Sequence, residues 1–194
     1  MKTSRNIKQL ENIVKKYLLE CRPGDLNHSL RVVEWVKKLG KDRLDLDILI
    51  ISAYLHDIGW YKILLNNDKI SKSAMKLLEP KANQNTEPTV RVILNKLDDS
   101  SININVILRL IDAADNHKSN AKDEAIIVDA DNLSKLNINH VSEKYQPESW
   151  LKMYSLWKAT FVDRIQTELG KQLYPGLLKQ LKHDIDKSLA NQVV

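Results

Sequence analysis

The apolar residues of this chain recur three and four positions apart, the spacing that marks one face of an α-helix. Within residues 5–20 this spacing is followed by Ile7, Leu10, Ile13, Val14 and Leu18. No segment of useful length alternates apolar and polar residues as a half-buried strand does, and the run 125–128 is the one segment that resembles a strand. The pattern therefore predicts an all-α protein.

Residues 44–58 form the most apolar predicted helix. Their apolar side chains would lie on nearly every face, which is typical of a helix in the middle of a bundle, and Gly59 is expected to end it. Asp25 is expected to cap a helix over 26–40, and Gly40 to end that helix. Further helices are predicted over 70–79, 86–97, 103–117, 121–136, 147–169 and 173–190.

Composition supports this organisation. Glycine and proline occur five times each in 194 residues, so turn signals are scarce and long helices are favoured. Apolar residues make up 43% and charged residues 28%, as in an ordinary globular protein. The length suits one compact domain over residues 1–194, and that single domain is our prediction.

The net charge of +5 is dispersed along the chain. A phosphate-bearing ligand would gain from this bias. A dedicated nucleic-acid surface would require a denser basic patch with aromatic platforms, and none is predicted. Cys21 is the sole cysteine, which excludes an intrachain disulfide and a thiolate metal site. No signal peptide and no apolar run of ~20 residues is recognisable, so we expect a cytoplasmic protein without a membrane segment.

Candidate chemistry lies where polarity is costly. His28 stands near the start of one predicted helix, and His56 and Asp57 stand at the end of the next. If these helices pack antiparallel, their polar ends meet. Asp131 lies in an otherwise apolar helix, where a lone carboxylate would need a partner or a cation. One bound metal would explain all four residues, although each taken alone is more typical of a hydrogen-bonded core residue or a helix cap.

Three segments resemble motifs of the HD superfamily of metal-dependent phosphohydrolases. Residues 28–32, His-Ser-Leu-Arg-Val, resemble the "HxxRV" helix of that superfamily. Residues 53–59, Ala-Tyr-Leu-His-Asp-Ile-Gly, resemble its "AxLHDIG" segment, and 128–133, Val-Asp-Ala-Asp-Asn-Leu, resemble "xxDADxL". The motifs cover about residues 20–136, and a looser resemblance continues over residues 164–171. The C-terminal helices are expected over about 147–190.

The resemblance implies an HD-type helical bundle that binds a divalent metal ion, with one or two ions as open alternatives. Its metal ligands would be His28, His56, Asp57 and Asp131, a nitrogen and oxygen set that suits Mn, Fe, Co, Ni or Zn. Asp129 and Asp131 are two positions apart and point in nearly opposite directions on a helix. In the family pattern the second carboxylate is the ligand, so Asp131 is chosen and Asp129 is expected to cap, pair with a base or face solvent.

Other charged residues leave alternatives open. His117 resembles an extra histidine that approaches the metal or a phosphate in some branches, but it would also suit a helix end facing water. Arg31, one turn after His28, would bind phosphate or pair with a surface acid. Lys171 poses the same question more weakly. We expect His140 and His183 at the surface. Ser73 and Ala74 lack the preceding histidine of many relatives, which argues against a second metal held by histidines.

The resulting functional prediction is a metal-dependent phosphohydrolase. Its substrate would be a small-molecule phosphate ester, a nucleotide or a related compound. Asp57 is predicted to be catalytic, because it would both ligate the metal and orient the attacking water. The alternatives are a metal-containing nucleotide-binding or regulatory protein without turnover, and a structural helical domain in which these residues are relics.

Overall fold

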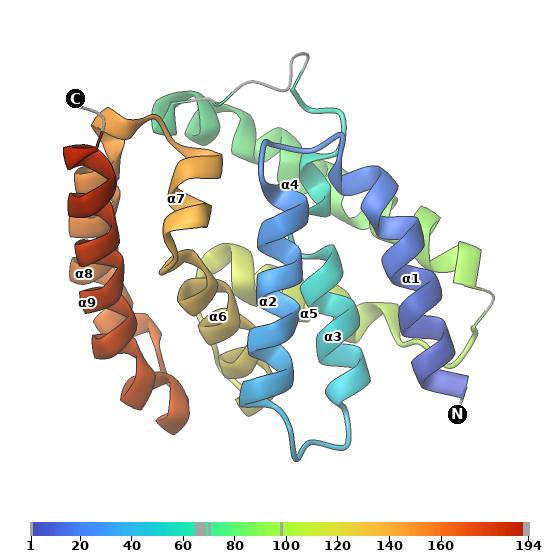
Figure 1. Cartoon of the computed structure of the whole chain (residues 1–194). Helices are drawn as coiled ribbons and strands as arrows, with labels where there is room; N and C mark the ends of the chain where they lie inside the picture. Colours follow the sequence, from blue (N-terminus) through green and yellow to red (C-terminus); the bar gives the residue numbers. More distant parts are fainter. Residues whose placement is uncertain (1, 65–68, 70, 98, 192–194) are drawn as a thin grey trace.

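We describe a computed structural model of residues 2–64, 69, 71–97 and 99–191 (Figure 1). These residues form helices and no β-strand, which confirms the all-α prediction. The α-helices are α1 (Lys2–Leu18), α2 (Asp25–Leu39), α3 (Leu46–Leu55), α4 (Lys72–Leu94), α5 (Ile104–Asn116), α6 (Lys122–Lys135), α7 (Ile138–Lys144), α8 (Trp150–Arg164) and α9 (Glu168–Ala190). The 3₁₀ helices are η1 (Ile58–Trp60), η2 (Asn95–Leu97) and η3 (Pro147–Ser149).

Helix α3 lies in the middle of the bundle, packed against α1, α2, α5 and α6, as its apolar sequence predicts. It is shorter than the predicted 44–58, because it ends at Leu55 and η1 follows after His56 and Asp57. Gly59 lies inside η1 and does not end α3. A Cβ on Gly59 would come within 2.4 Å of the Ala82 carbonyl oxygen, so its lack of a side chain permits close packing of α4.

Helix α4 corrects the prediction of two helices over 70–79 and 86–97. It runs without a break past Pro80 and Pro88, although each proline removes one backbone donor. The Ser71 hydroxyl caps its start by accepting the N–H of Ala74. Its buried side includes Ala82, Val90 and Ile93, and this packing outweighs the local preference of proline to end a helix. Residue 70 lies outside the described residues.

The start of α2 also differs from the prediction. Gly24 occupies the capping position with φ 76, and Asp25 is the first helical residue. The Asp25 side chain does not cap the helix; it is fully buried and forms ion pairs with Arg22 and Lys144. Gly40 follows the last residue of α2, as predicted.

The C-terminal third contains a helix that the sequence did not predict. Helix α7 and η3 precede α8, and the predicted helix over 147–169 is interrupted at Ile165, where the backbone becomes extended. Thr167 then caps α9 by accepting the N–H of Gly170. Among the described residues, no helix is long and apolar enough to cross a membrane.

Helix α6 connects two apolar clusters. The larger cluster is built on α1 to α6, and the smaller one joins the end of α6 to α7, α8 and α9. Figure 1 shows α8 and α9 stacked as a pair on one side of the molecule, with α6 and α7 between them and α2. Because α6 contacts α2, α5, α8 and α9, its side chains reach both halves of the fold.

Candidate metal centre

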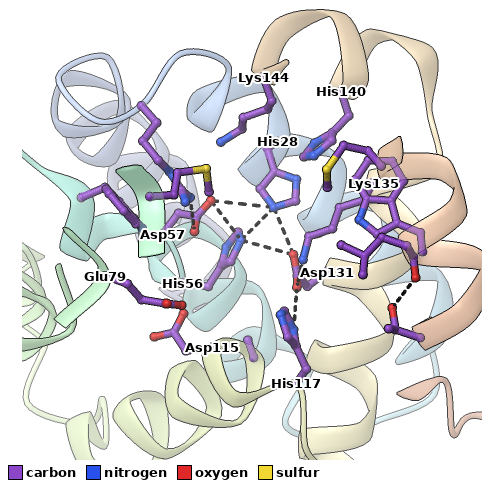
Figure 2. Close-up of a pocket in the computed structure, with 18 of the residues that line it drawn as sticks. His28, His56, Asp57, Glu79, Asp115, His117, Asp131, Lys135, His140 and Lys144 are labelled. Carbon is purple, nitrogen blue, oxygen red and sulfur yellow. Dashed lines mark hydrogen bonds and ion pairs between the residues drawn. The ribbon is translucent and has the colours of Figure 1, made fainter. Parts of the chain in front are cut away.

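Four side chains from three segments converge at the predicted place (Figure 2). The Nε2 atom of His28, on α2, lies 3.1 Å from the Nε2 atom of His56, which follows α3. Asp131 of α6 brings its Oδ1 to 3.1 Å from His28 Nε2 and 3.8 Å from His56 Nε2. The Oδ2 atom of Asp57 lies 3.8 Å from His28 Nε2 and 3.6 Å from His56 Nε2. All four side chains are almost completely buried.

The outer ring nitrogens fix the tautomers of both histidines. His56 Nδ1 lies 2.8 Å from the Ala53 carbonyl oxygen, an acceptor, so Nδ1 carries the hydrogen. Ser134 donates its hydroxyl hydrogen to the Asp131 carbonyl oxygen at 2.8 Å and therefore accepts from His28 Nδ1 at 3.1 Å. These tautomers, assigned from the hydrogen-bond network, leave both Nε2 atoms as lone-pair donors that face each other.

This donor set fits a divalent cation. Burial lowers the pKa of His28 to about 4, more than the neighbouring Asp131 raises it, so the ring is neutral near pH 7. The two nitrogen lone pairs then face each other and an oxygen of each carboxylate with no hydrogen between them, which is unfavourable unless a cation joins them. Ligand atoms 2.0–2.2 Å from a metal lie about 3.0–3.5 Å apart, close to the observed distances.

Cationic side chains hold the two carboxylates from outside. Arg22 Nη2 lies 2.6 Å from Asp57 Oδ1, and Lys135 Nζ lies 2.6 Å from Asp131 Oδ2. Burial would raise the pKa of Asp57, but Arg22 and the two histidines outweigh it and hold the pKa below its usual range. The pKa of Asp131 is likewise lowered, since Lys135 and His28 outweigh burial. Both carboxylates are therefore ionised and keep one oxygen directed at the cluster.

His117 lies beside the cluster, at the C-terminal end of α5 with φ 51. Its Nδ1 is 3.7 Å from Asp131 Oδ2, is buried, and has no hydrogen-bond partner among the described residues. Burial, reinforced by the charge of Lys135, lowers the pKa of His117 to about 4. A neutral imidazole with an unsatisfied nitrogen therefore faces the site. This position favours an approach to the metal or a phosphate over a helix end that faces water.

Arg31 and Lys171 lie elsewhere. Arg31 forms an ion pair in which its Nη2 lies 2.9 Å from Glu143 Oε2. The Arg31 side chain does not line the pocket that contains the cluster. This arrangement agrees with the pairing alternative that the sequence left open. Lys171 is exposed on α9, and its Nζ lies 3.2 Å from Glu168 Oε1. It does not line the pocket either.

The prediction of a surface position is wrong for His140 and confirmed for His183, which is exposed on α9. His140 is 2% exposed, and its ring centroid lies 4.8 Å from that of His28. The unpredicted helix α7 turns this residue inward, where Arg31 Nη2 lies 3.5 Å from its Nδ1. Burial and the adjacent His28 lower the pKa of His140 well below its usual value, so it packs on His28 as a neutral ring.

Asp129 points away from the cluster, toward the junction of α8 and α9. It accepts the backbone N–H groups of Gln166 and Thr167 and the Thr167 hydroxyl, at distances of 2.6–3.2 Å. Of the possibilities considered for Asp129, the structure therefore favours capping. The two carboxylates of α6 have separate surroundings, because Asp131 faces the histidines and Asp129 fastens the C-terminal helices to the bundle.

The cluster opens into a pocket of about 430 Å³ whose remaining walls the sequence did not predict. Two acids, Glu79 and Asp115, lie close together in it (Figure 2). Burial, with the charges of Asp57 and Asp131, raises the pKa of Asp115 to about 8. The position of Asp115 two residues before His117 was the available signal. Helix α8 closes the far side with Met153, Leu156, Trp157, Thr160, Phe161 and Arg164.

Comparison with known proteins decides the family. The profile of the HD domain matches residues 25–136 of the chain. The chain belongs to the HD domain family. HD domain proteins are generally metal-dependent phosphohydrolases, and His28, His56 and Asp57 form a group that could hold a metal ion. The match confirms the resemblance read from the motifs, and it ends before α7, so α8 and α9 are outside it. No curated protein and no solved structure matches the chain.

Proposed function

We propose that this HD domain protein hydrolyses a phosphate ester of a nucleotide or a related small molecule. The divalent cation would be held by His28, His56, Asp57 and Asp131. One observation carries the proposal: two unprotonated imidazole nitrogens and two ionised carboxylates converge at the base of a pocket. The nitrogen and oxygen donors suit Mn, Fe, Co, Ni or Zn.

The bound cation would lower the pKa of a water and offset negative charge on the phosphoryl oxygens. Asp57 is suited to orient that water, because Arg22 fixes its Oδ1 while Oδ2 faces the cluster. His117 directs a neutral imidazole at the same space and would bind a phosphoryl oxygen or a water. The buried rings of His28 and His56 are held in place by Ser134 and the Ala53 carbonyl, so the site requires little rearrangement.

The walls of the pocket support a nucleotide-like substrate. Trp60, Tyr145 and Trp157 contribute aromatic surface around a space in the size range of small-molecule sites. Nucleobases stack on aromatic side chains with little dependence on sequence. An aromatic wall beside a phosphate-binding end would hold a nucleotide by its two chemically different parts.

Phosphate release from a nucleotide panel, measured with each candidate metal, tests the proposal. Wild-type protein should release phosphate only with metal present, and His56→Ala should lose metal and activity together. His183→Ala is the matched control, because this histidine is exposed on α9 and should change neither. Metal binding without turnover would favour the regulatory alternative, and a folded protein that binds no metal would favour the relic alternative.

A further inference from the structure

The cationic side chains around the pocket differ in whether they have partners. Arg22 pairs with Asp25 and Asp57, while Lys135 pairs with Asp131. Lys144 also pairs with Asp25. Their positive charges are thus already used to hold carboxylates. Within the described residues, the lining cations that form no ion pair or hydrogen bond are Lys76, exposed on α4, and Arg164.

Arg164 is the partly buried one of these two, at the C-terminal end of α8. Burial lowers its pKa, and the charge of Asp131 acts against that shift. Arg164 lines the same pocket as His117 and Asp131, and its charge contributes to the lowered pKa of His117. A partly desolvated cation without an acceptor is unfavourable, and an unpaired arginine in a pocket is suited to bind an anionic ligand.

The contact of Arg164 with Phe161 does not account for its position. The guanidinium carbon lies 5.9 Å from the ring centroid, at the outer limit of a cation–π interaction. A stronger constraint comes from the backbone. Gln166 and Thr167, just beyond Arg164, are fastened to Asp129 by three hydrogen-bonding groups. The end of α8 is therefore held against α6, the helix that carries Asp131.

We propose that Arg164 binds a phosphoryl oxygen of the substrate, so that α8, which lies outside the HD domain match, completes the phosphate site. This inference rests on the proposed function. The planar guanidinium can donate two parallel hydrogen bonds to phosphate, which a lysine cannot do. The HD segment would supply the cation and the water, and the C-terminal helices of this chain would supply the substrate contact.

Inorganic phosphate is the probe for this proposal. Its Kd is measured by titration calorimetry on full-length protein, both loaded with Mn²⁺ and free of metal. Arg164→Gln should weaken phosphate binding by about tenfold or more in both states, as expected for loss of a charge-assisted hydrogen bond. The phosphate Kd of Arg164→Lys should lie between those of the wild type and Arg164→Gln. Lysine keeps the positive charge but lacks the planar group that donates two parallel hydrogen bonds. The KM for p-nitrophenyl phosphate should rise with the Kd.

Lys152→Gln is the matched control, since Lys152 is an exposed cation on the same helix and does not line the pocket. It should leave the phosphate Kd within about twofold, a change of under about 0.4 kcal/mol. A purely structural role for Arg164 predicts a lower Tm in phosphate-free buffer with an unchanged Kd, and that result would overturn the proposal.

The outcomes separate this proposal from the proposed function. Hydrolysis by the wild type with no effect of Arg164→Gln on Kd or KM would reject the role of Arg164 and leave the enzyme assignment standing. Phosphate binding that depends on Arg164 without any hydrolysis would retain the binding site and reject turnover. A wild-type protein that binds no phosphate in either state would overturn the role of Arg164, and the nucleotide panel would still decide the enzyme assignment.

Discussion

The Nε2 atoms of His28 and His56 face each other at 3.1 Å, and the outer nitrogen of each ring already donates to an oxygen. This relationship supports the proposed cation, because two lone pairs meet in a buried space beside two ionised carboxylates. It also gives Ser134 a defined role. Its hydroxyl accepts from His28 while donating to the Asp131 carbonyl, so one side chain orients two proposed ligand residues.

Ser134→Ala should therefore weaken metal binding without unfolding the protein. Loss of the acceptor frees the His28 ring to rotate and to change tautomer, and removal of such a partner typically costs 10–100-fold in metal affinity. Equilibrium dialysis against Mn²⁺ measures this effect. Ser52→Ala is the control, because Ser52 is also buried and also donates to a carbonyl within its own helix, but lies outside the pocket lining. Equal affinities in the two variants would argue against the tautomer assignment.

The metal-free protein should lose stability in mildly acidic solution. His28 and His117 have pKa values of about 4 when folded, against 6.5 for an ordinary histidine. The unfolded chain therefore binds more protons between these values, and the unfolding free energy falls as the pH drops from 6.5 toward 4. Asp115 acts in the opposite direction, since its pKa of about 8 favours the folded state at low pH.

Asp115→Asn protein isolates the histidine effect. In the presence of a chelator, its urea midpoint should be lower at pH 5 than at pH 7. Adding His117→Asn should make this drop smaller, because one titrating ring is removed and asparagine tolerates the left-handed backbone at this position. A midpoint that stays constant between the two pH values would contradict the buried neutral histidines.

Two glycines of α9 should respond oppositely to alanine. A Cβ on Gly170 would come within 2.7 Å of Asp129 Oδ2 and Thr167 Oγ1, so Gly170→Ala disturbs the junction of α8 and α9. We expect a loss of roughly 1–3 kcal/mol in unfolding free energy. Gly176 has nothing within 4 Å of the same position, and Gly176→Ala should raise stability by about 0.5–1 kcal/mol. Urea unfolding measures both, and a stabilising Gly170→Ala would show that Asp129 does not hold a close-packed junction.

Local sequence patterns predicted the elements that build the cluster. The apolar circumference of residues 44–58 predicted a central helix, and antiparallel packing predicted that His28 would meet His56 and Asp57. The two-residue offset between Asp129 and Asp131 predicted that they point apart, and their observed partners differ accordingly. These features depend on helix geometry, which short stretches of sequence specify.

Features that depend on distant contacts were not predictable in this way. Helical spacing places Arg31 one turn after His28, but its partner Glu143 is 112 residues away. The polar residues around His140 predict a surface position, but α7, which the sequence did not predict, packs this ring against His28. The prolines of α4 suggested an interruption that packing overrides. Arg164 lines the pocket because α8 packs against α6, and Asp129 of α6 binds the backbone just beyond the end of α8.

Metal stoichiometry of two neighbouring variants tests the central claim most directly. Wild-type protein loaded with Mn²⁺, dialysed and analysed by mass spectrometry should retain about one metal ion per chain, as the four converging donors imply. Asp131→Asn should lose it, because an amide lacks the charge and binds the cation weakly. Asp129→Asn should keep it while unfolding more readily, since its carboxylate contacts only the α8–α9 junction. Loss of metal from Asp129→Asn with retention by folded Asp131→Asn would contradict the account.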